Sequence, residues 1–268
     1  MKRAWIFFAI AIVLVIVYVV FYSPKPPIID PPIANTPAIS YSVVDALPHD
    51  TSAFTEGLSF YKGQLWESTG LPKKSVLRQV DISTGKALKG REVKIDSSLF
   101  GEGVVLLNDT IYQLTWQNHK VLVYTAKDLK LVKELPYPYD GWGLTTDGKD
   151  LIASDGSSNL YFFEPGTFRL LRTQGVTEGG SPAMNLNELE YVNGIIYANQ
   201  WQYNYILKID PATGQVIAKM DLSDLDKRAK AKYSNAEFLN GIAYDSTSKK
   251  FYVTGKNWPE IYQLQFNY

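Results

Sequence analysis

The side chains of this sequence that are suited to proton transfer are a few charged and amide groups set among aromatic residues. Glu102 stands between two glycines in "LFGEG", residues 99–103, just before an apolar run that predicts a buried strand. A carboxyl group buried against aromatic rings has a raised pKa and can act as an acid or base near neutral pH. One glutamate alone is weak support for a site, so related positions must be compared.

Those positions belong to a repeat. From residue 41 onward the chain predicts short strands separated by turn residues, with one helix over residues 222–234. A unit of two strands and a loop recurs, with starts 46, 40, 45 and 53 residues apart, at Glu56, Glu102, Trp142, Asn187 and Asn240. A third apolar strand follows each unit. A period near 45 residues is typical of propeller blades.

The last unit lacks the fourth strand that the other four units have, because the chain ends at Tyr268. The strand expected in "YSVVDALP", residues 41–48, can supply it and close the ring. We therefore predict an all-β fold, a five-bladed β-propeller over residues 41–268, closed by pairing of its N- and C-terminal strands.

Equivalent positions of such a repeat form rings around the central channel. The first position gives the ring Glu56, Glu102, Trp142, Asn187 and Asn240, and the end of the second strand gives Gly70, Trp116, Gly156, Trp201 and Lys256. A structural repeat should favour similar residues at equivalent positions, but the residues of each ring differ in chemical type. This difference indicates a functional site. Two other interpretations of these rings remain open. One is a water-filled polar channel with packed indoles, and the other is a calcium site at Glu56 and Glu102, which Lys256 would oppose.

Composition excludes several other kinds of site. The chain has no cysteine, which rules out thiol catalysis, thiolate zinc sites and disulfides. His49 and His119 are its only histidines, so a three-histidine metal site is impossible. The formal net charge is zero and no long basic run occurs, which argues against nucleic acid as a partner.

The N-terminal residues are expected to form a segment separate from the propeller. Residues 4–22 are uncharged and apolar, follow Lys2 and Arg3, and would form about 28 Å of helix, enough to span a bilayer. We expect residues 1–22 to be a transmembrane anchor, residues 23–40 a proline-rich linker, and the propeller to lie outside the cytoplasm, periplasmic or at the cell surface. A cleaved signal peptide is the alternative, although no cleavage site is evident.

Eight ordered motifs resemble the glutamine cyclotransferase family, the plant and bacterial type of glutaminyl-peptide cyclotransferase. They are "AFTEGL" (53–58), "LFGEG" (99–103), "YQLTW" (112–116), "GWGLTTDG" (141–148), "NELEY" (187–191), "ANQW" (198–201), "LNGIAYD" (239–245) and "TGKNWPEIY" (254–262). The resemblance covers roughly residues 41–268. It implies a five-bladed propeller, as the repeat does independently.

The resemblance also implies an activity, the conversion of N-terminal glutaminyl residues to pyroglutamate with release of ammonia, without metal or cofactor. It assigns Glu102 as the catalytic acid and base, and it places Asn187 and Lys256 in the active site. It gives the pocket walls as Trp116, Trp142 and Trp201, with Phe54 and Phe100 nearby. We expect a monomer whose partner is a peptide or protein with N-terminal glutamine.

One position departs from the family pattern. The first motif more often reads "FTQGL", whereas Glu56 stands here in place of the glutamine. A second carboxylate beside Glu102 would raise one of the two pKa values, bind the substrate amine more tightly, or shift substrate preference.

Two other functions are compatible with a propeller of this kind. The first is a binding module for peptides or envelope components, with the same pocket and no turnover. The second is a lactone hydrolase, which would need a channel metal whose ligand set looks incomplete in this sequence. The joint presence of Glu102, Asn187 and Lys256 favours the cyclotransferase.

Overall fold

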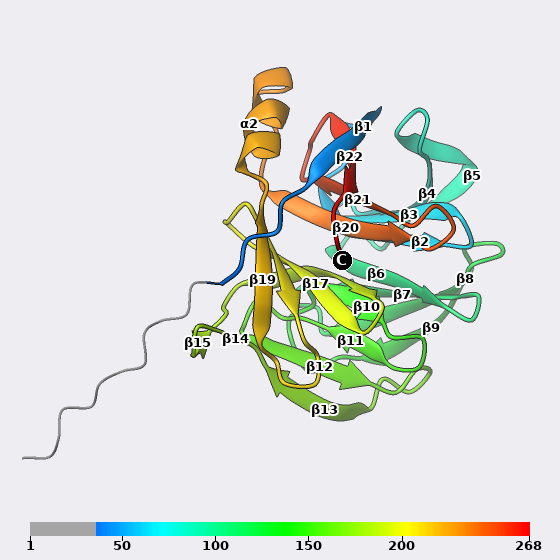
Figure 1. Cartoon of the computed structure of the whole chain (residues 1–268). Coiled ribbons are helices and arrows are strands. Elements are labelled where there is room, and N and C mark those ends of the chain that lie inside the picture. Colours follow the sequence, from blue (N-terminus) through cyan, green and yellow to red (C-terminus); the bar gives the residue numbers. More distant parts are fainter. Residues whose placement is uncertain (1–35) are drawn as a thin grey trace, which may run out of the picture. The chain divides into compact units, whose positions relative to one another are not determined.

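Five four-stranded antiparallel sheets surround a common axis in residues 36–268, the part of the chain that this computed structural model describes (Figure 1). Blade one contains β2 (Thr55–Tyr61), β3 (Gln64–Thr69), β4 (Val76–Asp81) and β5 (Lys86–Lys94). Blade two contains β6 (Gly101–Leu107), β7 (Thr110–Thr115), β8 (Lys120–Thr125) and β9 (Leu131–Pro136). Blade three contains β10 (Leu144–Thr146), β11 (Leu151–Ala153), β12 (Asn159–Phe163) and β13 (Leu170–Gly175).

The last two blades complete the ring and confirm the predicted closure. Blade four contains β16 (Leu186–Val192), β17 (Ile195–Gln200), β18 (Tyr205–Ile209) and β19 (Val216–Asp221). Blade five contains β20 (Leu239–Asp245), β21 (Lys250–Gly255), β22 (Glu260–Gln265) and, as its outer strand, β1 (Ser42–Pro48). β1 pairs with β22 from Ser42 opposite Gln265 to Pro48 opposite Glu260, and Figure 1 shows the two strands side by side.

The strand patterns follow from burial. The inner strand β6 is buried along its whole length, so it reads as a continuous apolar run, whereas the outer strands β5 and β9 are mostly exposed and carry charged residues. Two-residue hairpin turns at Lys62–Gly63, Asn108–Asp109 and Asn193–Gly194 have positive φ at both positions, the turn geometry whose twist matches the strands.

Apolar clusters fill the interfaces between neighbouring blades. One joins blades one and two around Trp66 and Leu106, and another joins blades two and three around Tyr112 and Phe163. The remaining three interfaces have clusters of their own within residues 36–268. Each blade is therefore apolar on both faces and depends on its two neighbours for burial.

The inner strands approach one another backbone to backbone at the channel. A Cβ on Gly57 would lie 2.5 Å from the Val104 nitrogen, and one on Gly143 would lie 2.0 Å from the Asn187 carbonyl oxygen. Gly103 donates its N–H to the Trp142 carbonyl oxygen at 2.7 Å. Only glycine fits at these contacts, because a side chain would separate the strands.

A buried carboxyl group completes this inner ring where glycine contacts do not. Glu188 is fully buried and accepts hydrogen bonds from the backbone of Leu58 at 3.1 Å and of Ile242 at 2.7 Å. It thus ties blade four to the inner strands of blades one and five. Burial raises the pKa of Glu188 well above its usual value.

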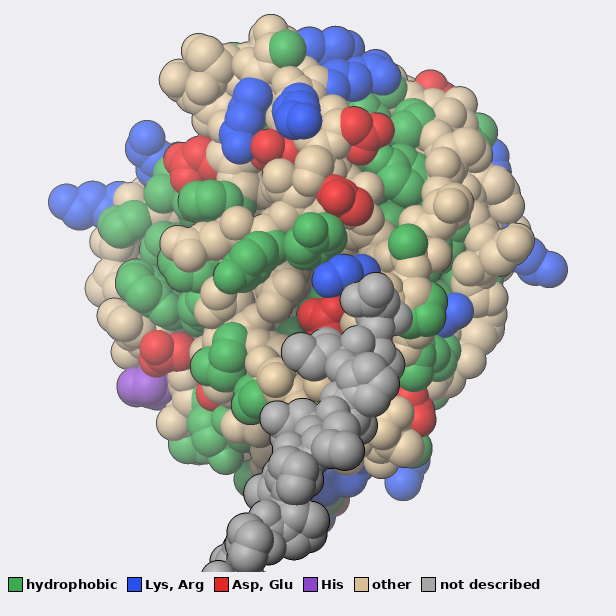
Figure 2. All heavy atoms as spheres, turned by 60° about the vertical axis from the view of Figure 1, so that its left-hand side comes forward, with side chains coloured by type: hydrophobic (Ala, Val, Ile, Leu, Met, Phe, Trp, Pro, Cys, Tyr) green, Lys and Arg blue, Asp and Glu red, His purple; other side chains and the backbone are tan. Residues whose placement is uncertain are grey.

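Three features lie between or outside the blades. The predicted helix is α2 (Ser223–Lys232), between blades four and five, and a short hairpin of β14 (Thr177–Glu178) and β15 (Ser181–Pro182) follows blade three. Basic side chains gather at the top of Figure 2, where α2 lies, and Arg228 and Lys232 of this helix pair with Glu260 of β22. The N-terminal segment reaches β19, where Ala38 bridges to Lys219.

The expected transmembrane segment, residues 4–22, lies outside the described residues. Within residues 36–268, no helix has the length and apolar character needed to cross a membrane.

The glycine contacts give a stability prediction. Gly143→Ala should lower the free energy of unfolding by about 1–3 kcal/mol, because its new methyl group overlaps the Asn187 backbone. Gly175→Ala is the control, since the nearest atom to its Cβ would be 3.8 Å away, and its effect should stay within about 0.5 kcal/mol. Denaturant unfolding of the purified variants measures both, and equal stabilities would contradict the proposed close packing.

Candidate active site

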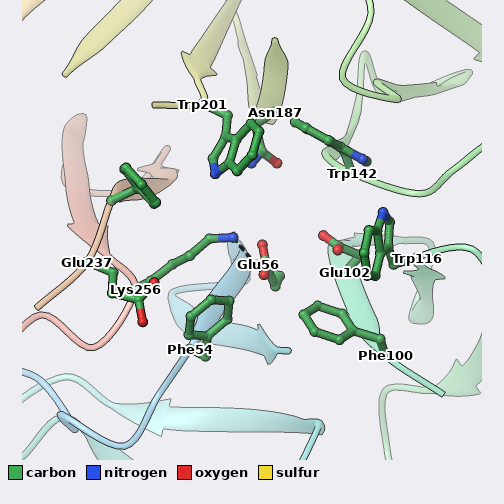
Figure 3. A pocket seen from close by; sticks show the side chains of 11 residues that line it. Phe54, Glu56, Phe100, Glu102, Trp116, Trp142, Asn187, Trp201, Glu237 and Lys256 are labelled. Atoms are coloured by element: carbon green, nitrogen blue, oxygen red, sulfur yellow. Dashed lines mark hydrogen bonds and ion pairs between the residues drawn. The ribbon is translucent and has the colours of Figure 1, made fainter. Parts of the chain in front are cut away.

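All nine side chains predicted for the site line one cavity of about 280 Å³ (Figure 3). They are Phe54, Glu56, Phe100, Glu102, Trp116, Trp142, Asn187, Trp201 and Lys256. Two further residues, Glu237 and Phe238, complete the lining. The structure therefore brings together residues that are up to about 200 positions apart in the sequence.

The repeat explains why these residues meet. Glu56, Glu102 and Asn187 lie at the starts of the inner strands β2, β6 and β16, and Lys256 follows the end of β21. In every blade the first strand starts and the second strand ends at the same end of the propeller. The cavity is thus built by equivalent blade positions around one end of the channel.

Aromatic side chains form two arcs around the cavity. In the first arc, Phe100 contacts Phe54 with ring centroids 6.4 Å apart and Trp116 with centroids 5.6 Å apart. In the second, Trp201 lies 5.4 Å from Trp142 and 6.0 Å from Phe238. Edge-to-face contacts of this kind hold each ring in a fixed orientation.

Two glycines of the second ring make room for these aromatic side chains. A Cβ on Gly70 would lie 2.4 Å from the Phe100 ring, and one on Gly156 would lie 2.6 Å from the Trp142 indole. The alternation of glycine and tryptophan at equivalent positions therefore has a packing cause. Each of the first four blades either supplies an indole at this position or has a glycine that leaves space for an aromatic ring.

The floor of the cavity is polar and buried. Glu56, Glu102, Asn187 and Lys256 are 1%, 6%, 3% and 7% exposed, respectively. The Lys256 ammonium donates to Oε1 of Glu56 at 2.7 Å and lies 4.6 Å from the centre of the Phe54 ring. Figure 3 shows Glu56 between Lys256 on one side and Glu102 on the other.

This arrangement shifts the pKa values of the two carboxyl groups to different extents. Burial and the adjacent charge of Glu56 raise the pKa of Glu102 well above its usual value, and Lys256 offsets only part of this effect. Burial also raises the pKa of Glu56, but its ion pair with Lys256 opposes the rise. The pKa of Glu102 is therefore raised further than that of Glu56, so of the two carboxyl groups Glu102 holds a proton more readily.

Two amide side chains differ in how far their hydrogen bonds are satisfied. Asn240 lies behind the floor and donates to the Thr55 carbonyl oxygen at 3.0 Å and to Oε2 of Glu56 at 3.3 Å. The side-chain oxygens of Asn240 and Asn187 are both buried without a hydrogen-bond partner among the described residues, but only Asn187 lines the cavity. An unpaired buried acceptor costs free energy, so Asn187 favours a ligand that carries a donor.

A second buried charge cluster supports the loops on the Lys256 side of the cavity. Glu67 accepts from Arg78 at 2.8 Å and from Thr55 at 2.7 Å, and the charges of Arg78 and His49 hold its pKa well below its usual range despite burial. His49 lies between Glu67 at 2.9 Å and the Trp258 carbonyl oxygen at 2.8 Å. The cluster thereby connects β2, which carries Glu56, with the turn after Lys256.

The residues missed by the sequence analysis, Glu237 and Phe238, come from the connection that carries α2. A signal for Phe238 was present, because it precedes Asn240 by two residues, as Phe54 precedes Glu56 and Phe100 precedes Glu102. The longer spacing of the fifth unit obscured this register. Glu237 had no such signal.

The position of Lys256 also argues against the calcium site that the sequence left open as an alternative. The ammonium group of Lys256 occupies the position beside Glu56 that a calcium ion would need. Two carboxyl groups with raised pKa values, an ammonium and an amide around one aromatic cavity are instead suited to moving protons and stabilising a polar intermediate.

Comparison with known proteins gives the same family as the motifs. The sequence pattern of a family described as glutamine cyclotransferase matches residues 12–266. A glutaminyl-peptide cyclotransferase of Arabidopsis thaliana is 42% identical over 229 residues, which are 83% of this chain and 70% of the relative. The crystal structure of Myxococcus xanthus glutaminyl cyclase superposes with a TM-score of 0.81 and 33% identity, over 87% of this chain and 99% of the other. The chain belongs to the glutamine cyclotransferase family.

Proposed function

We propose that this protein converts N-terminal glutaminyl residues of peptides to pyroglutamate and releases ammonia. The observation that carries the proposal is the placement of Glu102, a buried carboxyl group with a raised pKa, on the floor of an aromatic pocket. The names of the Arabidopsis and Myxococcus relatives support the same activity.

The substrate glutamine enters the pocket with its amino group and its side chain folded toward each other. The tryptophan walls exclude water, which would compete with the amine as nucleophile, and restrict the flexible side chain to this conformation. The free side-chain oxygen of Asn187 accepts a hydrogen bond from an N–H of the substrate. This contact favours a glutaminyl amide over a carboxylate, which has no proton to donate.

Glu102 transfers protons in both directions. The neutral α-amine attacks the side-chain carbonyl carbon and forms a tetrahedral intermediate. Glu102 gives its proton to the leaving amide nitrogen, the carbon–nitrogen bond breaks, and ammonia departs. The carboxylate left on Glu102 then takes the extra proton from the attacking nitrogen, so the lactam forms and the enzyme returns to its starting state.

Lys256 and Asn187 stabilise the negative charge that develops on the carbonyl oxygen. An ammonium group and an amide N–H on the same floor are the donors that such an intermediate needs. Glu56 holds the ammonium in place and, through its own charge, keeps Glu102 protonated. We therefore assign Glu56 a tuning role and Glu102 the proton transfer.

The activity is tested with a glutamine-initiated peptide and an assay for ammonia. Wild-type protein should release ammonia and continue to do so after treatment with EDTA. Glu102→Gln keeps the size of the side chain but cannot shuttle a proton, so turnover should fall by about 10²–10⁴ while the fold survives.

Peptide binding without ammonia release by the wild-type protein would identify a binding module instead. Activity that EDTA abolishes and added zinc or calcium restores would contradict the metal-free mechanism.

Glu56→Gln restores the residue usual in the family and should remain active. Its pH optimum should move down, because loss of the negative charge of Glu56 lowers the pKa of Glu102. The positive charge of Lys256, which no longer has an ionised partner, lowers this pKa as well. Activity needs protonated Glu102, so its alkaline limit follows that pKa downward. pH–rate profiles of both proteins measure the shift. If the Glu56→Gln variant were inactive and the Glu102→Gln variant were active, the two roles would be reversed.

We also propose that residues 4–22 anchor the protein in a membrane, with a monomeric propeller outside the cytoplasm. The support is their uncharged apolar sequence, which is long enough to span a bilayer. The full chain should therefore sediment with membranes and resist extraction by high salt. Recovery of a soluble protein that begins near residue 24 would indicate a cleaved signal peptide.

A further inference from the structure

The mouth of the pocket carries an acidic residue that the proposed mechanism does not use. Of the charged residues that line the cavity, Glu237 is the one that is exposed, whereas Glu56, Glu102 and Lys256 are buried. Figure 3 shows Glu237 on the Lys256 side of the pocket, opposite Glu102 and Trp116. Its side chain forms no ion pair or hydrogen bond within residues 36–268.

A second carboxylate lies on the other side of the same end of the propeller. Asp140 is partly buried in the connection between β9 and β10, two residues before Trp142. Its side chain likewise has no partner in the described part of the chain. The charges of these two residues reach the floor, because Glu237 raises the pKa of Glu56 and Asp140 raises that of Glu102.

The floor itself offers little net charge to balance them. Lys256 is the one cationic residue among the described residues that line the cavity, and its ammonium is paired with Glu56 at 2.7 Å. The unpaired charge around the pocket is therefore negative, and most of it lies at the mouth. A ligand enters past this rim toward the free acceptor of Asn187, which is 97% buried.

A peptide substrate must place its second residue at that mouth. The proposed function puts the reacting groups of the first residue at the floor, so the peptide continues through the exposed end of the pocket, where Glu237 lies. We propose that the enzyme prefers peptides in which lysine or arginine directly follows the N-terminal glutamine, and that Glu237 is the residue that determines this preference. This inference rests on the proposed function.

The size of the preference follows from exposure. Interactions of exposed charges are weak, so a basic second residue should raise kcat/KM by about two- to fivefold over alanine, and an acidic one should lower it by a similar factor. Salt should remove most of this difference, because the screening length falls to roughly 4 Å near 0.5 M ionic strength.

The experiment compares three peptides that differ only in their second residue, Gln-Lys, Gln-Ala and Gln-Glu, each with the same neutral, amidated continuation. The full-length protein in detergent is assayed for ammonia at low and high salt. Glu237→Gln should lose the ranking, so that its kcat/KM is the same for the three peptides. The matched control is Glu92→Gln, an exposed carboxylate on the outer strand β5, which should keep the wild-type ranking.

Each outcome decides a different claim. Equal kcat/KM for the three peptides in wild type would overturn the specificity while leaving the cyclisation intact. A ranking that Glu237→Gln preserves would remove Glu237 as its cause, and a loss of rate with all three peptides would place this residue at the substrate amine instead. If no peptide releases ammonia from wild type, the proposed function itself fails.

Discussion

The buried ion pair between Lys256 and Glu56 is the interaction that sets the electrostatics of the site. Removing two charges from water is costly, and such a pair contributes little to net stability, so its value lies in what it positions. It fixes the ammonium at the floor of the pocket and leaves a negative charge beside Glu102. That charge, together with burial, raises the pKa of Glu102 well above its usual value. One contact between blades one and five thus supplies a donor for the intermediate and an acid for the leaving group.

The rest of the propeller serves to bring these groups to one end of the channel. Glycine contacts close the inner ring between blades one to four, and Glu188 bridges blade four to blades one and five. The Glu67 cluster then connects the elements that carry Glu56 and Lys256. Together these buried contacts fix the positions of the reacting groups relative to one another. The closure by β1 has the same consequence, because it holds blade five, and with it Lys256, against blade one.

Much of the fold was predictable because the sequence repeats it. The blade count and the closing strand follow from the repeat. Seven of the nine predicted lining residues stand at its equivalent positions, whereas Phe54 and Phe100 came from the family resemblance, and all nine line the cavity. The β14–β15 hairpin and the α2 connection were harder, because insertions do not obey the period. Glu237 was missed for that reason. The pairing of Glu56 with Lys256 rather than with a cation was also beyond the sequence, since it depends on side-chain conformations 200 residues apart.

The central claim is that one proton in the resting pocket belongs to Glu102 while Glu56 is ionised. Isotope-edited infrared spectroscopy of protein labelled with ¹³C-carboxyl glutamate can test it, because protonated and ionised carboxyl groups absorb at different frequencies. The difference between wild type and Glu102→Gln at pH 7 should contain the band of a protonated carboxyl group. A carboxylate band in that difference, with the protonated band lost instead in Glu56→Gln, would contradict the account.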